Sequence, residues 1–81
     1  MKYLAIIVKA GNGYSAYLPD LPGCVAAGDT HEETDELIRQ AVVYHLELMA
    51  GHGELIPEPA STALEVEVEL REVVEAGRLS H

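Results

Sequence analysis

The sequence contains no tryptophan and no phenylalanine, and its four tyrosines are its only aromatic residues apart from histidine. The interior of this 81-residue chain must therefore be built from aliphatic side chains. Its single cysteine, Cys24, excludes a disulfide within the chain. A chain this short buries only about 60% of the surface that it exposes when unfolded. We therefore expect self-association to add to its stability.

Basic residues are scarce. Five lysines and arginines stand against fourteen aspartates and glutamates, which gives a formal net charge of −9. Proteins that bind nucleic acids need a basic surface to neutralise phosphates, so we expect no direct nucleic-acid binding. An acidic surface instead speeds the encounter with a basic protein partner. The alternative interpretation is a well-solvated surface that keeps the protein soluble.

Long apolar runs are also missing. The run YLAIIV near the N-terminus is far shorter than the roughly 20 apolar residues of a membrane-spanning helix. No small-residue cleavage site of a signal peptide follows it. These features predict a cytoplasmic protein without membrane contact.

Three short segments in the first third of the chain have the pattern of strands. Residues 2–10 are almost continuously apolar and rich in β-branched side chains, and the Gly-Asn-Gly that follows is typical of a hairpin turn. Residues 14–18 are therefore expected to return antiparallel. The prolines of the next loop end this strand. The small residues 24–28 predict a third strand to which other backbone comes close.

A helix is predicted next. Thr30 precedes Glu33 by three residues, which is the pattern of a capping box, and acidic residues fill the first turns where the helix dipole favours them. Gly51 and Gly53 are expected to end the helix. The residues that recur at helical spacing along one face are Leu37, Ile38, Ala41, Val42, His45, Leu46 and Met49.

A connector with two prolines at residues 54–62 is followed by the stretch at residues 63–72. Within it, residues 64–70 alternate strictly between apolar and acidic side chains. This alternation predicts a half-buried strand with an acidic outer row. A right-handed crossover through the helix would place it parallel to the first strand. The apolar row is Leu64, Val66, Val68 and Leu70, and the acidic row is Glu65, Glu67 and Glu69.

The predicted fold class is thus α+β: a two-layer β-β-β-α-β domain with one helix on a four-stranded mixed sheet. We place this domain at residues 1–70 and a short C-terminal tail at residues 71–81. A single helix covers only one face of a sheet, so the other face is expected to be partly covered, which again indicates oligomers.

Two pairs of residues raise the question of catalysis. Cys24 and His31 could form a thiol–imidazole pair, but nothing in the sequence orients the histidine, and a small buried residue that opens a strand is the favoured interpretation. Asp20 and Asp29 could share a Mg²⁺ ion or an acid–base role. Asp20 between two prolines is typical of a turn, however, and Asp29 precedes the helix. We predict no catalytic residue.

The histidines at positions 31, 45, 52 and 81 lack the spacing of three or four residues that a helical zinc site uses. The Gly-Asn-Gly is followed by a strand and not by a helix, so neither nucleotide-binding fingerprint applies. We predict neither a metal site nor a cofactor, and the chain is interpreted as a binding module.

The segments YLPDLPGC at residues 17–24 and GDTHEE at residues 28–33, with small residues between them, resemble the HicB-like antitoxin family over roughly residues 3–50. The resemblance implies a partial RNase-H-like fold, assembly into homodimers or homotetramers, and binding to a small basic HicA-type toxin that cleaves RNA. It also implies that the matching residues are mainly architectural. These are Pro19, Asp20, Leu21, Pro22, Gly23, Cys24, Gly28, Asp29 and Thr30.

Under this interpretation the protein would block its toxin by steric occlusion, with acidic side chains meeting the basic toxin. Many family members carry a DNA-binding segment after the last strand. Here the tail has only Arg71 and Arg78 as basic residues, so operator binding is not expected. The expected partner-binding residues are Glu32, Glu33, Asp35, Glu36, Glu65, Glu67 and Glu69.

Two alternatives stay open. The first is an orphan homo-oligomeric module that has neither a toxin partner nor an operator. The second is a small hydrolase built on Cys24 and His31.

Overall fold

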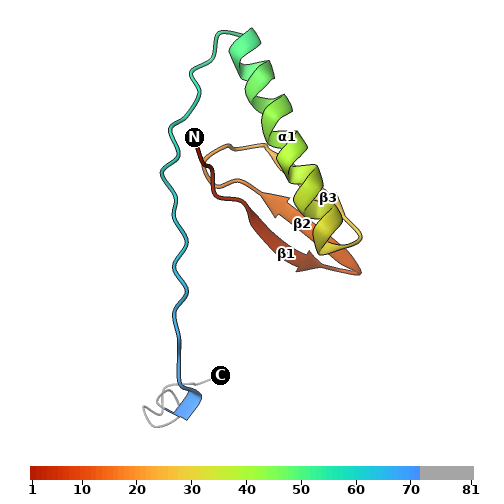
Figure 1. The fold of residues 1–81 in the computed structure, drawn as a ribbon, viewed down its shortest axis with the longest axis vertical. Coiled ribbons are helices and arrows are strands. Elements are labelled where there is room, and N and C mark those ends of the chain that lie inside the picture. The colour runs from red at the N-terminus through yellow and green to blue at the C-terminus, as the bar shows by residue number, and fades with distance from the viewer. Residues whose placement is uncertain (72–81) are drawn as a thin grey trace.

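The computed structural model describes residues 1–71, which form a three-stranded sheet followed by one helix (Figure 1). Strands β1 (Ile6–Ala10), β2 (Gly13–Tyr17) and β3 (Val25–Gly28) are antiparallel and lie side by side in that order. Helix α1 (His31–Gly51) lies across one face of the sheet, as Figure 1 shows. The predicted α+β class and the order of these four elements are confirmed.

The pairing register decides which side chains meet the helix. Ile7 lies opposite Ala16, and Ala16 lies opposite Ala26. Because side chains alternate along a strand, these three residues share one face of the sheet. They pack in the same apolar cluster as Ile38 of α1, so this is the face that the helix covers.

Strand β1 begins at Ile6, later than the predicted start at residue 2. The turn to β2 consists of Gly11 and Asn12, and Gly11 has a φ angle of 59°. This left-handed conformation carries no steric penalty for glycine. The predicted hairpin is therefore confirmed.

The start of α1 is the predicted capping box. The Thr30 hydroxyl oxygen accepts a hydrogen bond from the Glu33 N–H at 3.0 Å. The Glu33 carboxylate in turn accepts one from the Asp29 N–H at 2.6 Å. The first bond satisfies a backbone donor that the first turn of a helix leaves without a partner, and the second satisfies the N–H of the residue just before the N-cap.

The apolar face of α1 packs on the sheet largely as predicted. Ile38 is buried, and Ala41, Val42 and other residues of this face pack against the core. Leu37 lies at the margin of this face, with 37% of its surface exposed. Thr34, which the apolar pattern does not include, is completely buried, and its hydroxyl donates a 2.8 Å hydrogen bond to the Thr30 carbonyl.

The loop between β2 and β3 contributes to the core. Leu18, Leu21 and Cys24 are all buried, although none of them belongs to a strand or helix. Backbone hydrogen bonds from the Leu21 N–H to the Leu18 carbonyl and from the Cys24 N–H to the Leu21 carbonyl keep the loop compact. The buried side chains and the tight backbone explain why two prolines, Gly23 and the single cysteine occur so close together in this loop.

The predicted fourth strand is wrong for the sheet of this chain. Residues 54–69 belong to no helix or strand, and within residues 1–71 the sheet has three strands. Figure 1 shows this part of the chain running in an extended course past the N-terminus and away from the sheet. We call residues 62–69 the C-terminal arm; at Leu70 the backbone turns helical. Alternation specifies an amphipathic strand, but it does not specify which edge the strand joins.

The described residues therefore form a three-stranded antiparallel sheet, and not the predicted four-stranded mixed sheet. The RNase-H-like relation, which the family resemblance implies, stays a prediction. Across residues 1–71 no helix combines the length and the apolar character that crossing a membrane requires.

Candidate partner-binding surfaces

The acidic residues at the start of α1 fall into two kinds. Glu33 is occupied by the helix cap, and Asp35 forms an ion pair with Arg39 one turn along the helix. This hydrogen-bonded pairing with Arg39 lowers the pKa of Asp35. Glu32 and Glu36 are exposed, and among the described residues neither has a hydrogen bond or an ion pair. These two carboxylates are therefore the ones available to a partner.

The second predicted acidic set lies elsewhere. Glu65, Glu67 and Glu69 are exposed on the C-terminal arm. Figure 1 shows the arm well separated from the start of α1. The structure thus does not bring the two acidic sets together into one surface within a single chain.

The face of the sheet opposite α1 is apolar and uncovered by the described residues. Ile6, Tyr17 and Val25 are cross-strand neighbours on this face, and Val8 shares it. Val25 is 65% exposed, and Val8 and Tyr17 are each 43% exposed. The one-helix architecture predicted a partly covered second face, but the continuous apolar run of β1 did not distinguish a buried face from an exposed one.

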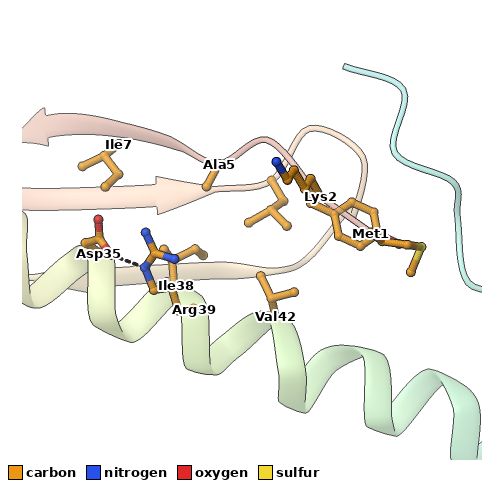
Figure 2. Close-up of a pocket in the computed structure, with 10 residues that line it drawn as sticks. Met1, Lys2, Ala5, Ile7, Asp35, Ile38, Arg39 and Val42 are labelled. Carbon is orange, nitrogen blue, oxygen red and sulfur yellow. Dashed lines mark hydrogen bonds and ion pairs between the residues drawn. The ribbon is translucent and has the colours of Figure 1, made fainter. Parts of the chain in front are cut away.

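A cavity of about 660 Å³ lies between the β1 side of the sheet and α1 (Figure 2). Ala5 and Ile7 line it from β1 and the residues before it, and Ile38 and Val42 line it from the helix. Figure 2 shows these side chains pointing into the space between strand and helix, with Met1 and Lys2 at one end of it. No pattern in the sequence predicts this cavity, which lies beside β1 at the edge of the sheet.

Asp20 connects the loop to the segment after the helix. Its carboxylate accepts hydrogen bonds from the Ala60 N–H at 2.8 Å, from the Ser61 N–H at 2.8 Å and from the Ser61 hydroxyl at 2.9 Å. These donors lower the pKa of Asp20, the Ala60 N–H having the largest effect. The sequence suggested a local turn for Asp20, and the interaction instead spans 40 residues of the chain.

The proposed thiol–imidazole pair finds no support in the geometry. Cys24 is 2% exposed in the core, and burial raises the pKa of its thiol. The nucleophile in such chemistry is the thiolate, which this environment disfavours. His31 instead contacts the ring of Tyr14 edge-on, with ring centroids 5.7 Å apart.

The remaining histidines do not form a metal centre in the part of the chain that the structure describes, where no group of three suitable ligands occurs. His45 and His52 line a second cavity beside Leu21 and Pro22. The imidazole Nδ1 of His52 lies 3.7 Å from the Glu54 carboxylate, at the exposed end of α1.

Sequence comparison relates the chain to known proteins. Residues 3–76 match the HicB-like antitoxins of bacterial toxin–antitoxin systems. A UPF0150 protein of the archaeon Thermoplasma acidophilum is 40% identical over 58 residues, which cover 70% of this chain and 84% of that protein. A UPF0150 protein of Helicobacter pylori is 43% identical over 42 residues, which cover 52% of this chain and 58% of that protein.

A 14.9 kDa protein from the rep–hol intergenic region of Haemophilus phage HP1 is 38% identical over 58 residues. The match covers 72% of this chain and only 44% of the phage protein, so the chain corresponds to less than half of that relative.

Proposed function

The chain belongs to the HicB-like antitoxin family, and from this membership we propose that it binds a small, basic, RNA-cleaving toxin of the HicA type and neutralises it by steric occlusion. Membership in an antitoxin family points to a regulatory protein without catalysis of its own. The buried, protonated thiol of Cys24 is consistent with that role.

The observation that carries the proposal is the pair of free carboxylates at the start of α1. Glu32 and Glu36 are exposed on a helix whose first turn is fixed by the Thr30 cap. A chain with a net charge of −9 attracts a cationic protein over a distance. Charges at such a site change the association rate more than they change the final affinity.

Steric occlusion also needs contact area that excludes water. The uncovered sheet face supplies apolar side chains from all three strands, among them Val8, Tyr17 and Val25. Protein interfaces of this kind combine an apolar centre with a polar rim. The acidic residues would then act in the encounter and the apolar face in the stability of the complex.

Calorimetric titration of the protein into the product of an adjacent small gene for a basic protein, at low and at high salt, tests this proposal. We expect tight binding that weakens as salt rises, because screening reduces the attraction between opposite charges. The absence of heat at both salt concentrations, with both proteins folded, would contradict neutralisation of that neighbour and leave the orphan homo-oligomeric module as the better account.

Stopped-flow association measurements locate the contribution of charge. The double variant Glu32→Gln/Glu36→Gln should lower the association rate several-fold and change the dissociation rate little. Glu47→Gln/Glu58→Gln, a pair of exposed substitutions away from the start of α1, removes the same number of charges and is the matched control. Equal effects of both variants would show that only net charge matters and that the start of α1 is not a contact.

A further inference from the structure

The C-terminal arm is amphipathic along its length, and no part of the described chain covers it. Its apolar side chains are largely exposed: Leu64 by 86%, Val66 by 71% and Val68 by 60%. The glutamates at the alternate positions are exposed as well. Among residues 1–71 the arm belongs to no sheet and makes no hydrogen bond or ion pair. It is therefore a third surface, separate from the start of α1 and from the uncovered sheet face.

The arm has the length and the shape of a strand. Its eight residues form no helix, and Figure 1 shows them in an extended course; strands of globular proteins are most often about five or six residues long. Side chains of an extended chain alternate between two faces, so the apolar row and the acidic row lie on opposite faces. Extended segments bind by adding to an exposed sheet edge, where main-chain hydrogen bonds supply affinity and alternate side chains supply specificity.

Two contacts hold the base of the arm on the folded body. The Tyr3 hydroxyl donates to the Pro57 carbonyl, and the Ser61 N–H and hydroxyl donate to the Asp20 carboxylate. Beyond Ser61 no interaction with the described residues holds the arm, and Figure 1 shows it leading away from the sheet. The arm is thus presented to another molecule, and its direction can adjust to that molecule.

Charge decides which kind of molecule fits the arm. In a sheet, opposite charges on cross-strand neighbours stabilise the pairing and like charges destabilise it. A second copy of this chain is acidic itself, with fourteen acidic residues against five lysines and arginines. The outer face of its β1 edge carries Ile6 and Val8 and no basic side chain. A basic protein with an open sheet edge is complementary to the acidic row, and its interior to the apolar row.

We propose that the C-terminal arm adds as an edge strand to the sheet of a basic protein partner. The apolar row then packs against the partner's interior, and the acidic row lies beside basic side chains of the partner's edge strand. The identity of this partner rests on the proposed function: it is the same basic toxin. The inference adds the mode of binding, in which the main chain of the arm holds the complex while Glu32 and Glu36 act in the encounter.

Amide hydrogen exchange measured by NMR tests the strand pairing. The full chain is labelled with ¹⁵N and mixed with the unlabelled product of the adjacent small gene for a basic protein. We expect alternate amides within residues 64–69 to be protected, because only every second N–H of an edge strand points to its neighbour. A complex that forms with uniform protection or with none along the arm would overturn the strand addition and leave the proposed function intact. If no complex forms, the proposed function fails, and the strand addition fails with it.

Variants of the apolar row separate strand addition from charge attraction. Val66→Asp/Val68→Asp makes the arm more acidic, so attraction alone predicts tighter binding to a basic partner. Strand addition predicts the opposite, a dissociation constant raised roughly tenfold or more, because the new carboxylates are buried against the partner's interior. The matched control Val43→Asp/Tyr44→Asp adds the same two charges at exposed positions of α1 and should bind no more weakly than the wild type. An arm variant that binds as tightly as this control would overturn the proposal.

Folding does not confuse this comparison. Neither double variant alters a residue of the apolar core, and helical circular dichroism checks that both remain folded.

The free protein reveals a different occupant of the arm, if there is one. Without the partner, we expect the amides of the arm to exchange at the rate of a free peptide. Alternating protection in the free protein would show that the arm already pairs within its own chain or with a second copy, and the proposal would be rejected.

Discussion

The carboxylate of Asp20 accepts two hydrogen bonds from Ser61, one from its backbone N–H at 2.8 Å and one from its hydroxyl at 2.9 Å. With the additional bond from the Ala60 N–H, this contact fixes the connector against the loop between β2 and β3. Together with the hydrogen bond from the Tyr3 hydroxyl to the Pro57 carbonyl, the Asp20 side chain therefore determines the position from which the C-terminal arm leaves the folded body.

Substitution of Asp20 should release the connector without unfolding the sheet and helix. In Asp20→Ala, the amides of Ala60 and Ser61 lose their only acceptor in the described chain, and their hydrogen exchange should approach the rate of a free peptide. Exchange measured by NMR checks this, with Glu58→Gln as a control in the same connector. Unchanged protection in Asp20→Ala would show that other contacts fix the connector.

The same contact should depend on pH in one direction. The pKa of Asp20 lies below its ordinary value of 3.8, because the Ala60 and Ser61 groups donate to the ionised carboxylate. A lowered folded-state pKa contributes stability that is complete above the unfolded-state value and is lost as the pH falls through the folded-state value. Protection of the Ala60 and Ser61 amides should be constant above about pH 5 and decline below about pH 4.

Asp20→Asn is the control for this titration, because its side chain does not titrate and its amide retains one acceptor oxygen. Its exchange rates should follow only the intrinsic pH dependence of amides. An identical acid transition in the wild type and in Asp20→Asn would assign the transition to another group.

Two glycines should respond oppositely to alanine. A Cβ atom at Gly13 would lie 2.5 Å from the carbonyl oxygen of Gly28, a backbone atom that cannot move without disturbing the β2–β3 pairing. Gly13→Ala should therefore lower the free energy of unfolding by about 1–3 kcal/mol. At Gly51, in the last turn of α1, no atom lies within 4 Å of the new methyl group. Gly51→Ala should raise the free energy of unfolding by about 0.5–1 kcal/mol.

Urea unfolding followed by circular dichroism measures both substitutions on the same scale. If the two variants shift the midpoint in the same direction, the close approach of Gly13 to β3 does not control stability.

The thiol of Cys24 should be unreactive in the folded protein. It is 2% exposed, and burial raises its pKa, so little thiolate is present at neutral pH. Labelling with a thiol reagent should be at least tenfold slower than in urea-unfolded protein. Rapid labelling under native conditions would reopen the catalytic interpretation.

Cys24→Ser provides an independent measurement on the same residue. It buries a hydroxyl in the apolar core and should destabilise the fold by about 1–3 kcal/mol. Under conditions in which the variant is fully folded, its affinity for the partner should equal that of the wild type, because the side chain does not reach the surface.

The elements that were predictable from the sequence are those determined by neighbours along the chain. The turn at Gly11 and the Thr30 cap depend on residues within a few positions, and both are present. The contact between Asp20 and Ser61 joins positions 41 residues apart, and a sequence pattern carries no information about such a pair. The buried Thr34 satisfies its hydroxyl within the helix, which is why a polar residue is tolerated in a core position.

The C-terminal arm also shows that a local sequence pattern does not determine tertiary contacts. The alternation at Leu64, Val66 and Val68 specifies a local conformation with one apolar side. It does not specify the strand that covers this side or the chain to which that strand belongs. The acidic residues behave similarly: Glu33 and Asp35 are part of the predicted cluster, but the structure engages them with Asp29 and Arg39.

The simple strand order has a consequence for how the chain folds over time. Every strand pairs with its neighbour in sequence, and α1 packs directly on the strands that precede it. Short-range topologies of this kind fold rapidly, because little chain entropy is lost before each contact forms. The body up to Gly51 can therefore assemble first, and docking of the connector at Asp20 follows as a separate, later step.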